Sequence, residues 1–144
     1  MEAVGRDEIL RLIPHQGSMC LLDSVVSFSE TQIECRSASH RDPHNPLRHG
    51  GALAAVHLAE YGAQAMAIHG GLLGRAGGGP GRRGLLVTLR DLKLAVARID
   101  DIAAPLAVKA RRLLANADGL LYAFEVEADG RALASGRVGV LHQN

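Results

Sequence analysis

Three polar side chains share one stripe of an otherwise apolar segment, Ala52–Gly70 (ALAAVHLAEYGAQAMAIHG). His57, Glu60 and Gln64 fall at positions i, i+3 and i+7, which lie on one face of a helix. A segment that is apolar on its other sides is typical of a buried helix. A carboxylate among Ala, Leu and Met side chains is costly unless it is partnered. We therefore interpret Glu60 as a functional group held in a core helix.

The other two polar residues of the stripe have ordinary structural roles available. Gln64 is a candidate substrate-binding residue, although a hydrogen bond from helix to loop is the commoner role of such an amide. For His57 a satisfied histidine of the core or of an interface is the favoured interpretation. His69, next to Gly70, is expected to serve the C-terminus of the helix, where a cationic side chain is favoured.

The segment before this helix, residues 40–51 (HRDPHNPLRHGG), is polar and rich in Pro and Gly, so we expect an irregular loop. It carries His40 and His44, and histidine is the side chain best suited to take up a proton near neutral pH. Both are candidate catalytic residues, although polar loops commonly carry solvated histidines. The candidate substrate-binding residues of the same loop are His49, Asn45, Arg48, Gly50 and Gly51.

The remaining sequence predicts one short helix and about six strands. Arg6–Leu12 has a helical period that Pro14 ends. Strand-like runs are Val25–Phe28, Gln32–Ser37, Leu85–Ala95, Leu106–Leu114, Leu121–Ala128 and Arg131–Leu141. Asp129-Gly130 between the last two runs is the strongest hairpin signal, whereas the glycine-rich residues 74–84 predict a flexible loop.

Strands joined by short turns favour an antiparallel sheet, and one long helix covered by such a sheet is an α+β layer arrangement. The length of 144 residues fits a single domain, residues 1–144. A sheet that wraps one helix leaves edges and part of the helix bare. Pairing through an edge strand covers them, so we expect a homodimer.

Composition excludes several classes of function. The net charge is +1 and aromatic residues make up 3% of the chain, so the sequence offers neither a basic surface for phosphates nor aromatic side chains for base stacking. Binding of nucleic acid is therefore not expected. The N-terminus lacks the apolar run of a signal peptide, and no segment predicts a membrane span. Cys20 and Cys35 have no metal-ligand spacing and are expected to be buried thiols in a cytoplasmic protein. No metal is expected.

Two blocks of sequence resemble the hot-dog-fold 3-hydroxyacyl-ACP dehydratases. Ile13-Pro14-His15 followed by Met19–Val25 is similar to the opening of that family, a Leu-Pro-His and a short apolar run ending in Asp and Val. Glu60-Tyr61-Gly62-Ala63-Gln64 resembles the Glu-x-x-Ala-Gln stretch of its central helix. A particular likeness is to the divergent branch encoded beside aryl-polyene and related polyketide-like pathways.

The resemblance implies a fold and a site. The fold is a curved antiparallel sheet around a long helix, dimerised into one continuous sheet, with a site built from both subunits. A loop histidine removes the proton α to the thioester carbonyl, and a helix carboxylate, here Glu60, handles the departing 3-hydroxyl. A backbone N–H near the start of the helix holds the thioester oxygen. A glutamate whose pKa is raised by an apolar environment suits this acid role.

The chain departs from the family pattern in the loop. The usual Gly-His-Phe-Pro-Gly is replaced by residues 44–50 (HNPLRHG), which makes His44 the first choice for the base, with His40 and His49 as alternatives. The Pro-Gly that usually begins the helix is Ala54-Ala55 here, and Gly50 or Gly51 is the alternative source of the amide donor. Arg48, Arg75, Arg82 and Arg83 are candidates to receive a phosphopantetheine phosphate or an acidic carrier protein.

Three functions are consistent with these residues. The first is dehydration of a 3-hydroxyacyl thioester on an acyl carrier protein, with no cofactor besides the phosphopantetheine that carries the substrate. The second is hydrolysis of an acyl thioester, in which a helix carboxylate acts with water. The third is a non-catalytic acyl-binding or partner subunit. Fold alone does not choose among them.

Overall fold

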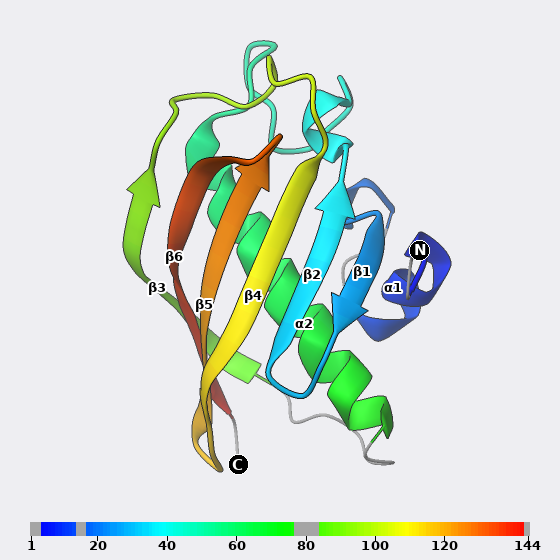
Figure 1. Cartoon of the computed structure of the whole chain (residues 1–144), viewed down its shortest axis with the longest axis vertical. Helices are drawn as coiled ribbons and strands as arrows, with labels where there is room; N and C mark the ends of the chain where they lie inside the picture. The colour runs from blue at the N-terminus through cyan, green and yellow to red at the C-terminus, as the bar shows by residue number, and fades with distance from the viewer. Residues whose placement is uncertain (1–3, 14–16, 77–83, 143–144) are drawn as a thin grey trace.

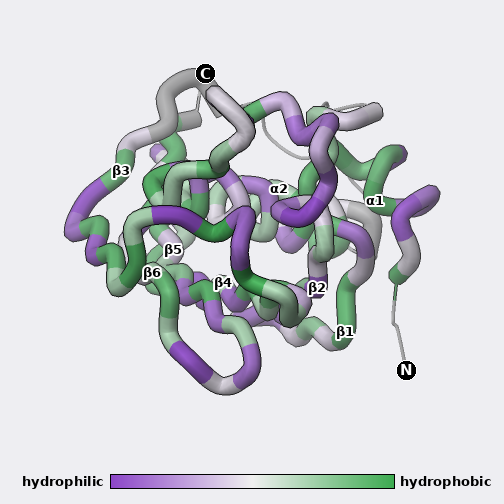
Figure 2. The backbone as a smooth tube through the Cα atoms, turned by 90° about the horizontal axis from the view of Figure 1, so that it is seen from above, coloured by the Kyte–Doolittle hydropathy of each residue, from purple (hydrophilic) through white to green (hydrophobic). Residues whose placement is uncertain are grey.

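A six-stranded antiparallel sheet curves around one long helix, and its strand order is β1-β2-β4-β5-β6-β3 (Figure 1). The structure is a computed structural model and describes residues 4–13, 17–76 and 84–142. Seen from above, the strands form an arc that holds α2 on its concave side (Figure 2). The elements are α1 (Arg6–Leu12), β1 (Ser24–Phe28), β2 (Gln32–Ser37), α2 (Leu58–Ala76), β3 (Gly84–Leu94), β4 (Leu106–Ala115), β5 (Gly119–Ala128) and β6 (Arg131–His142). The predicted α+β arrangement is confirmed.

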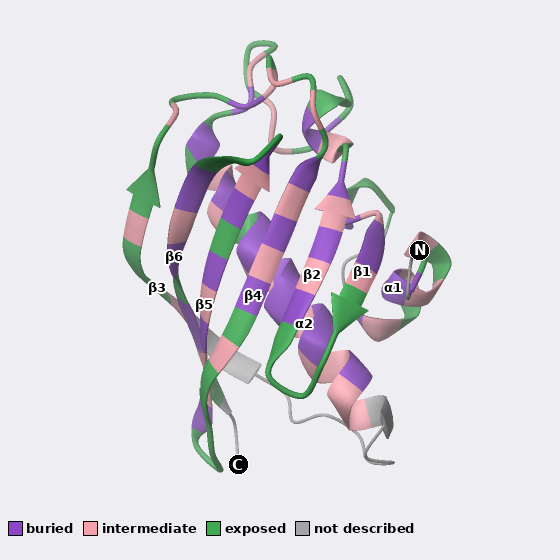
Figure 3. Cartoon of the chain, viewed as in Figure 1, coloured by how far each residue is buried: buried purple, intermediate pink, exposed green. Residues whose placement is uncertain are grey.

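The predicted strands agree closely with the observed ones, because side chains alternate between the two faces of the sheet. Buried and less buried residues follow one another along β2, β4 and β5 (Figure 3). The turn between β5 and β6 has positive φ at both Asp129 (52°) and Gly130 (76°). This is the backbone of a type I′ turn, which Asp-Gly favours.

The strand that follows the long helix does not lie next to β4. β3 pairs with β6 at the far edge of the sheet, and the chain then crosses the start of α2 through residues 95–105 to reach β4 in the centre. At the opposite edge, Val4 bridges Val25, one of the five residues of the shorter strand β1. β3 is therefore the long open edge, and it exposes Leu89 and Leu94.

The long helix begins and ends later than its apolar run predicts. Ala52 and Ala54 are extended and lie in isolated bridges, residues Ala55–His57 form a 3₁₀ turn, and α2 follows. The prediction of a flexible loop at 74–84 is wrong at its ends, since residues 74–76 belong to α2 and Gly84 to β3. Residues 77–83 of that prediction, and Pro14 and His15 of the family block, lie outside the described residues.

The core lies between the sheet and α2, and a glycine sets how closely the two approach. A Cβ added at Gly62 would lie 2.5 Å from Cγ of Phe124, a ring that is 1% exposed. The ring therefore packs directly on the backbone of the helix. Cys20 and Cys35 are free and buried, as predicted.

His69 is the core residue whose position differs most from its predicted role at the end of the helix. It lies well inside α2, is fully buried, and does not serve the end of the helix. Its Nε2–H donates to the carbonyl of Ser29 at 2.7 Å, and its Nδ1 accepts from the hydroxyl of Tyr122 at 2.5 Å. Burial lowers the pKa of His69, so the neutral ring ties α2 to β5 and to the β1–β2 turn. The prediction of a helix-terminal cation is wrong.

Replacing Gly62 by Ala is expected to lower the free energy of unfolding by about 1–3 kcal/mol, because the new methyl group overlaps the Phe124 ring. Gly70→Ala in the same helix is the matched control, since nothing lies within 4 Å of its added Cβ. The control is expected to gain about 0.5–1 kcal/mol from helix propensity. Urea unfolding of both variants measures the difference, and equal effects would contradict the packing argument.

Candidate functional site

The start of α2 is held by the segment that crosses it. The N–H of Leu53 donates to Oδ1 of Asp100 at 2.8 Å, and the N–H of Ala55 donates to the carbonyl of Ala97 at 2.9 Å. Arg98 pairs with Asp100, and this hydrogen bond, followed by that from Leu53, holds the pKa of the Asp100 carboxyl well below its usual range. The amide of Ala55, which stands where the resemblance implies the glycine that begins the helix, is therefore occupied.

Glu60 lies in the first turn of α2, and its own chain does not enclose it. The side chain is 51% exposed, and its Oε2 accepts a hydrogen bond from Nδ1 of His57 at 2.8 Å. The half-buried Ala59 and Ala63 are its neighbours on this side of the helix. The expectation that the helix is buried on every side is wrong for the single chain, because the sheet covers only part of it.

Gln64 binds the chain rather than facing an open site. Its Oε1 accepts from the N–H of Leu21 at 2.8 Å, and its Nε2 donates to the carbonyl of Met19 at 2.7 Å. The residue is 5% exposed. Both ends of the amide are thus used to fix the 19–22 segment on α2, which is the structural alternative considered for this residue.

A buried polar network joins the 39–45 loop to the helix one residue after Glu60. The hydroxyl of Tyr61 lies 2.8 Å from that of Ser39 and accepts from Nδ2 of Asn45 at 3.1 Å. Asn45 also donates to the carbonyl of Ser39 and accepts from the N–H of Leu47. Burial raises the pKa of Tyr61, so its hydroxyl stays neutral. Asn45 therefore organises the loop rather than lying open to a substrate.

His40 is the loop histidine with an unusual environment. The residue is fully buried, and its Nε2–H donates to the carbonyl of Ile102 at 2.9 Å. Its Nδ1 is buried without a hydrogen-bond partner, and burial lowers the pKa of His40. The ring is therefore neutral, and its lone pair is on Nδ1. A buried polar atom without a partner costs free energy and calls for a reason.

The other candidates of the loop lie near its surface. Arg48 clamps the loop by donating to the carbonyls of Asp42, Gly51 and His40. Gly50 and Gly51 form a turn with φ of 59° and 80°, closed by the bridge between His49 and Ala52. The side chains of His44 and His49 are exposed.

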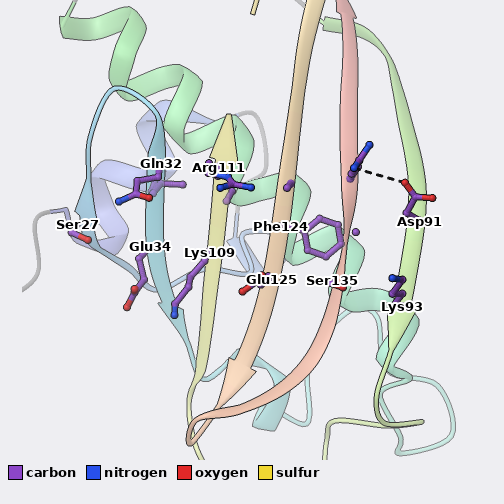
Figure 4. A pocket seen from close by; sticks show the side chains of 15 residues that line it. Ser27, Gln32, Glu34, Asp91, Lys93, Lys109, Arg111, Phe124, Glu125 and Ser135 are labelled. Carbon is purple, nitrogen blue, oxygen red and sulfur yellow. Dashed lines mark ion pairs between the residues drawn. The ribbon is translucent and has the colours of Figure 1, made fainter. Parts of the chain in front are cut away.

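Two of the hollows on the described part of the chain lie close to residues considered above or on the sheet. One, of about 280 Å³, adjoins the Ser39–Asn45 network and is also lined by Arg6, Asp23 and Asp42. The other, of about 670 Å³, lies on the sheet among charged side chains such as Lys109, Glu125 and Lys93 (Figure 4). Since Lys109 and Glu125 alternate with the buried Val108 and Phe124, they face away from α2. The larger hollow is thus separated by the sheet from Glu60.

Sequence reasoning missed the residues that hold the site together. A tyrosine directly after a candidate carboxylate was the available signal for Tyr61, because a buried phenol needs a partner for its hydroxyl. Ser39 and Asp100 carry no such signal, since each acts on a segment distant in sequence. Among the described residues, no group of three or more His, Cys, Asp or Glu side chains converges as a metal site requires.

Comparison with known proteins decides the family. The model of the ApeP-like family, described as ApeP dehydratase, matches residues 7–144 of the 144 in this chain. The chain belongs to the ApeP-like dehydratase family. It is accordingly a lyase, as the resemblance implied. No curated protein matched the chain.

Solved structures share the hot-dog fold with this ApeP-like chain. The dehydratase heterocomplex ApeI:P from Xenorhabdus doucetiae matches 94% of this chain and 91% of its own, with a TM-score of 0.83 and 23% identity. Zebrafish thioesterase superfamily member 2 matches with a TM-score of 0.64 and 13% identity, over 96% of this chain and 95% of its own. At these identities the likeness concerns the fold. None of the described helices combines the length and apolarity needed to cross a bilayer.

Proposed function

We propose that this protein removes water from a 3-hydroxyacyl thioester to give the 2-enoyl thioester. The observation that carries the proposal is the dehydratase family match, which spans residues 7–144. We place the reaction in fatty-acid or polyketide-like biosynthesis, with the acyl group delivered on the phosphopantetheine of an acyl carrier protein and no other cofactor. The cytoplasmic location expected from the sequence is part of the same proposal.

The elimination needs an acid for the leaving hydroxyl, and we assign that role to Glu60. Hydroxide is a poor leaving group, so a proton must reach the 3-oxygen as its bond to carbon breaks. Glu60 lies on the open side of α2, and Oε2 alone is engaged with His57. The other oxygen is therefore available to a substrate hydroxyl. An amide of the Gly50–Gly51 turn is our candidate for holding the thioester oxygen, because that of Ala55 is engaged.

For the base we favour His40 over His44. The bond from Nε2 to Ile102 fixes the tautomer of His40 and leaves Nδ1 as a proton acceptor. Burial lowers the pKa of His40, so the ring is neutral and its Nδ1 is unprotonated. Ser39 and Asn45 pin this loop to Tyr61, next to Glu60. His44 is exposed. Because His40 is enclosed in the single chain, the proposal requires that substrate binding open its surroundings.

We propose that the site is completed by a second copy of this chain bound along β3. This strand is the open sheet edge, and it presents Leu89 (46% exposed) and Leu94 (42% exposed). Pairing there continues the sheet and covers apolar side chains. The heterocomplex formed by the Xenorhabdus ApeI:P assembly supports a protein partner in this family. Arg48 is not proposed as a phosphate contact, since its guanidinium is used within the loop.

Incubation of the protein with a 3-hydroxyacyl carrier protein, followed by mass spectrometry, tests the function. Loss of one water from the acyl group is expected, and Glu60→Gln is expected to lower the rate by at least about a hundredfold, the lower end of the range for general acid–base catalysis. Release of free thiol would indicate the hydrolase instead. An unchanged substrate would indicate a non-catalytic subunit. Normal turnover by the Gln variant would rule out the site.

The choice of base is tested by comparing two histidine variants. His40→Gln places an amide donor where Nε2 bonds Ile102 but removes the lone pair of the ring, so dehydration is expected to fall about a hundredfold or more while the fold is kept. His44→Ala is expected to stay within about threefold of the wild-type rate, because it removes only an exposed side chain. Circular dichroism checks folding in both. The opposite order of rates would assign the base to His44.

Light scattering after gel filtration tests whether two copies of the chain pair along β3. We expect a mass twice that of the 15.2 kDa chain, and a shift to monomer with loss of activity for Leu89→Glu, because a charge would be buried at the edge. Leu114→Glu is the control, a leucine that is 54% exposed on β4, and is expected to stay dimeric. A wild-type monomer would overturn the homodimer and point to a different partner subunit.

A further inference from the structure

The hydrogen bond between His57 and Glu60 singles out a residue for which the sequence favoured a structural role. Nδ1 of His57 lies 2.8 Å from Oε2 of Glu60, and their side chains are 33% and 51% exposed. Within residues 4–13, 17–76 and 84–142, this is the one hydrogen bond recorded between a histidine ring and a carboxylate. It involves the same carboxylate to which the proposed function assigns the acid role.

The backbone that carries His57 is fixed on both sides of the ring. On its N-terminal side, Leu53 and Ala55 are bonded to the 97–100 segment. The residue itself ends a 3₁₀ turn, with its N–H donating to the carbonyl of Ala54 at 3.1 Å. On its C-terminal side α2 begins at once. Because this backbone is fixed, the His57 side chain can hold the Glu60 carboxyl in one orientation, which a catalytic site requires.

The partner of Nδ1 defines which ring nitrogen donates. A neutral imidazole has one N–H donor and one lone pair, and the carboxyl oxygen Oε2 that faces Nδ1 is an acceptor. In that state Nδ1–H donates to Oε2, and the lone pair of the ring is on Nε2. One oxygen of the carboxyl is thus held by His57, and Oε1 faces the open side.

We propose that His57 is a positioning residue for Glu60, which orients the carboxyl and stabilises the anion that forms when Glu60 gives up its proton. This inference rests on the proposed dehydration. In that step the Cα–H bond breaks, its electron pair forms the Cα=Cβ bond, and the Cβ–O bond breaks. The base takes the α-proton, and the proton of Oε1 goes to the departing oxygen, so water leaves.

The hydrogen bond from His57 strengthens as this happens, because a donor binds an ionised carboxylate about twice as strongly as a neutral one. Afterwards the base releases its proton to solvent and Glu60 takes one up, so the net change is loss of water. An ordinary ion pair on the surface would not strengthen during the reaction, and removing one of its partners would leave kcat unchanged.

Two substitutions at His57 separate these cases. His57→Asn retains an N–H donor at nearly the position of Nδ1, whereas His57→Phe keeps the bulk and removes the donor. We expect the Phe variant to lose roughly tenfold to hundredfold in kcat with KM little changed, the range for a misplaced catalytic group. The Asn variant is expected to stay within about threefold of the wild type. Lys109→Ala, which removes the exposed Lys109–Glu127 pair on the outer face of the sheet, is the control and is expected to keep wild-type kcat.

The outcomes are distinguishable. Wild-type kcat in His57→Phe, or equal losses in the Asn and Phe variants, would overturn the positioning role. In the double variant His57→Phe/Glu60→Gln, the rate should equal that of Glu60→Gln alone, since the two residues act as one unit. A further loss in the double variant would show that His57 acts independently. If Glu60→Gln is inactive while His57→Phe is normal, only this inference fails; if Glu60→Gln is normal, the proposed function loses its site.

Discussion

The site depends on one feature of α2: its few polar side chains each bind a different segment of the chain. Tyr61 holds the 39–45 loop, Gln64 holds the 19–22 segment, and His69 holds the β1–β2 turn and β5. Buried polar groups must be hydrogen-bonded, so each residue fixes the position of its partner. Glu60 differs from this series, because its partner, His57, ends the 3₁₀ turn directly before α2 and its own side chain is 51% exposed. It is this difference on which the proposed acid role of Glu60 rests.

Small residues explain how such a helix fits inside the sheet and leaves one side open. Gly62 brings the helix backbone against the Phe124 ring, and Ala59, Ala63 and Ala67 are only half-buried. A larger residue at these alanines would cover Glu60 from its own chain. With alanines there, the first turns of α2 remain accessible to another surface. The open edge of β3 and this side of the helix are therefore two consequences of a sheet that wraps only part of its helix.

The fold was predictable from the sequence because it follows from periodicity. Alternation predicted β2, β4, β5 and β6 within one or two residues at most ends, and Asp129-Gly130 predicted a turn with positive φ. The start of α2 was not predictable. Ala52–Val56 has excellent helix propensity, yet its backbone bonds the 97–100 segment, which lies more than 40 residues away in sequence. The role of His69 was missed for the same reason, since Tyr122 is its partner only through the fold.

The sequence singled out one carboxylate for the candidate site and left several histidines open. Glu60 drew attention as an acidic residue in an apolar segment, whereas the structure leaves its side chain 51% exposed beside His57. The histidines of this chain are distinguished by environment alone. His44 and His49 are exposed, His40 is enclosed with one bare nitrogen, and His57 meets a carboxylate. Because Nε2 of His40 donates to the carbonyl of Ile102, the lone pair of the neutral ring is on Nδ1, and a lone pair is what a base offers to a proton. The same reasoning separates the two roles assigned here: His57, already hydrogen-bonded, is suited to hold Glu60, while His40, with no partner on Nδ1, is suited to take the α-proton.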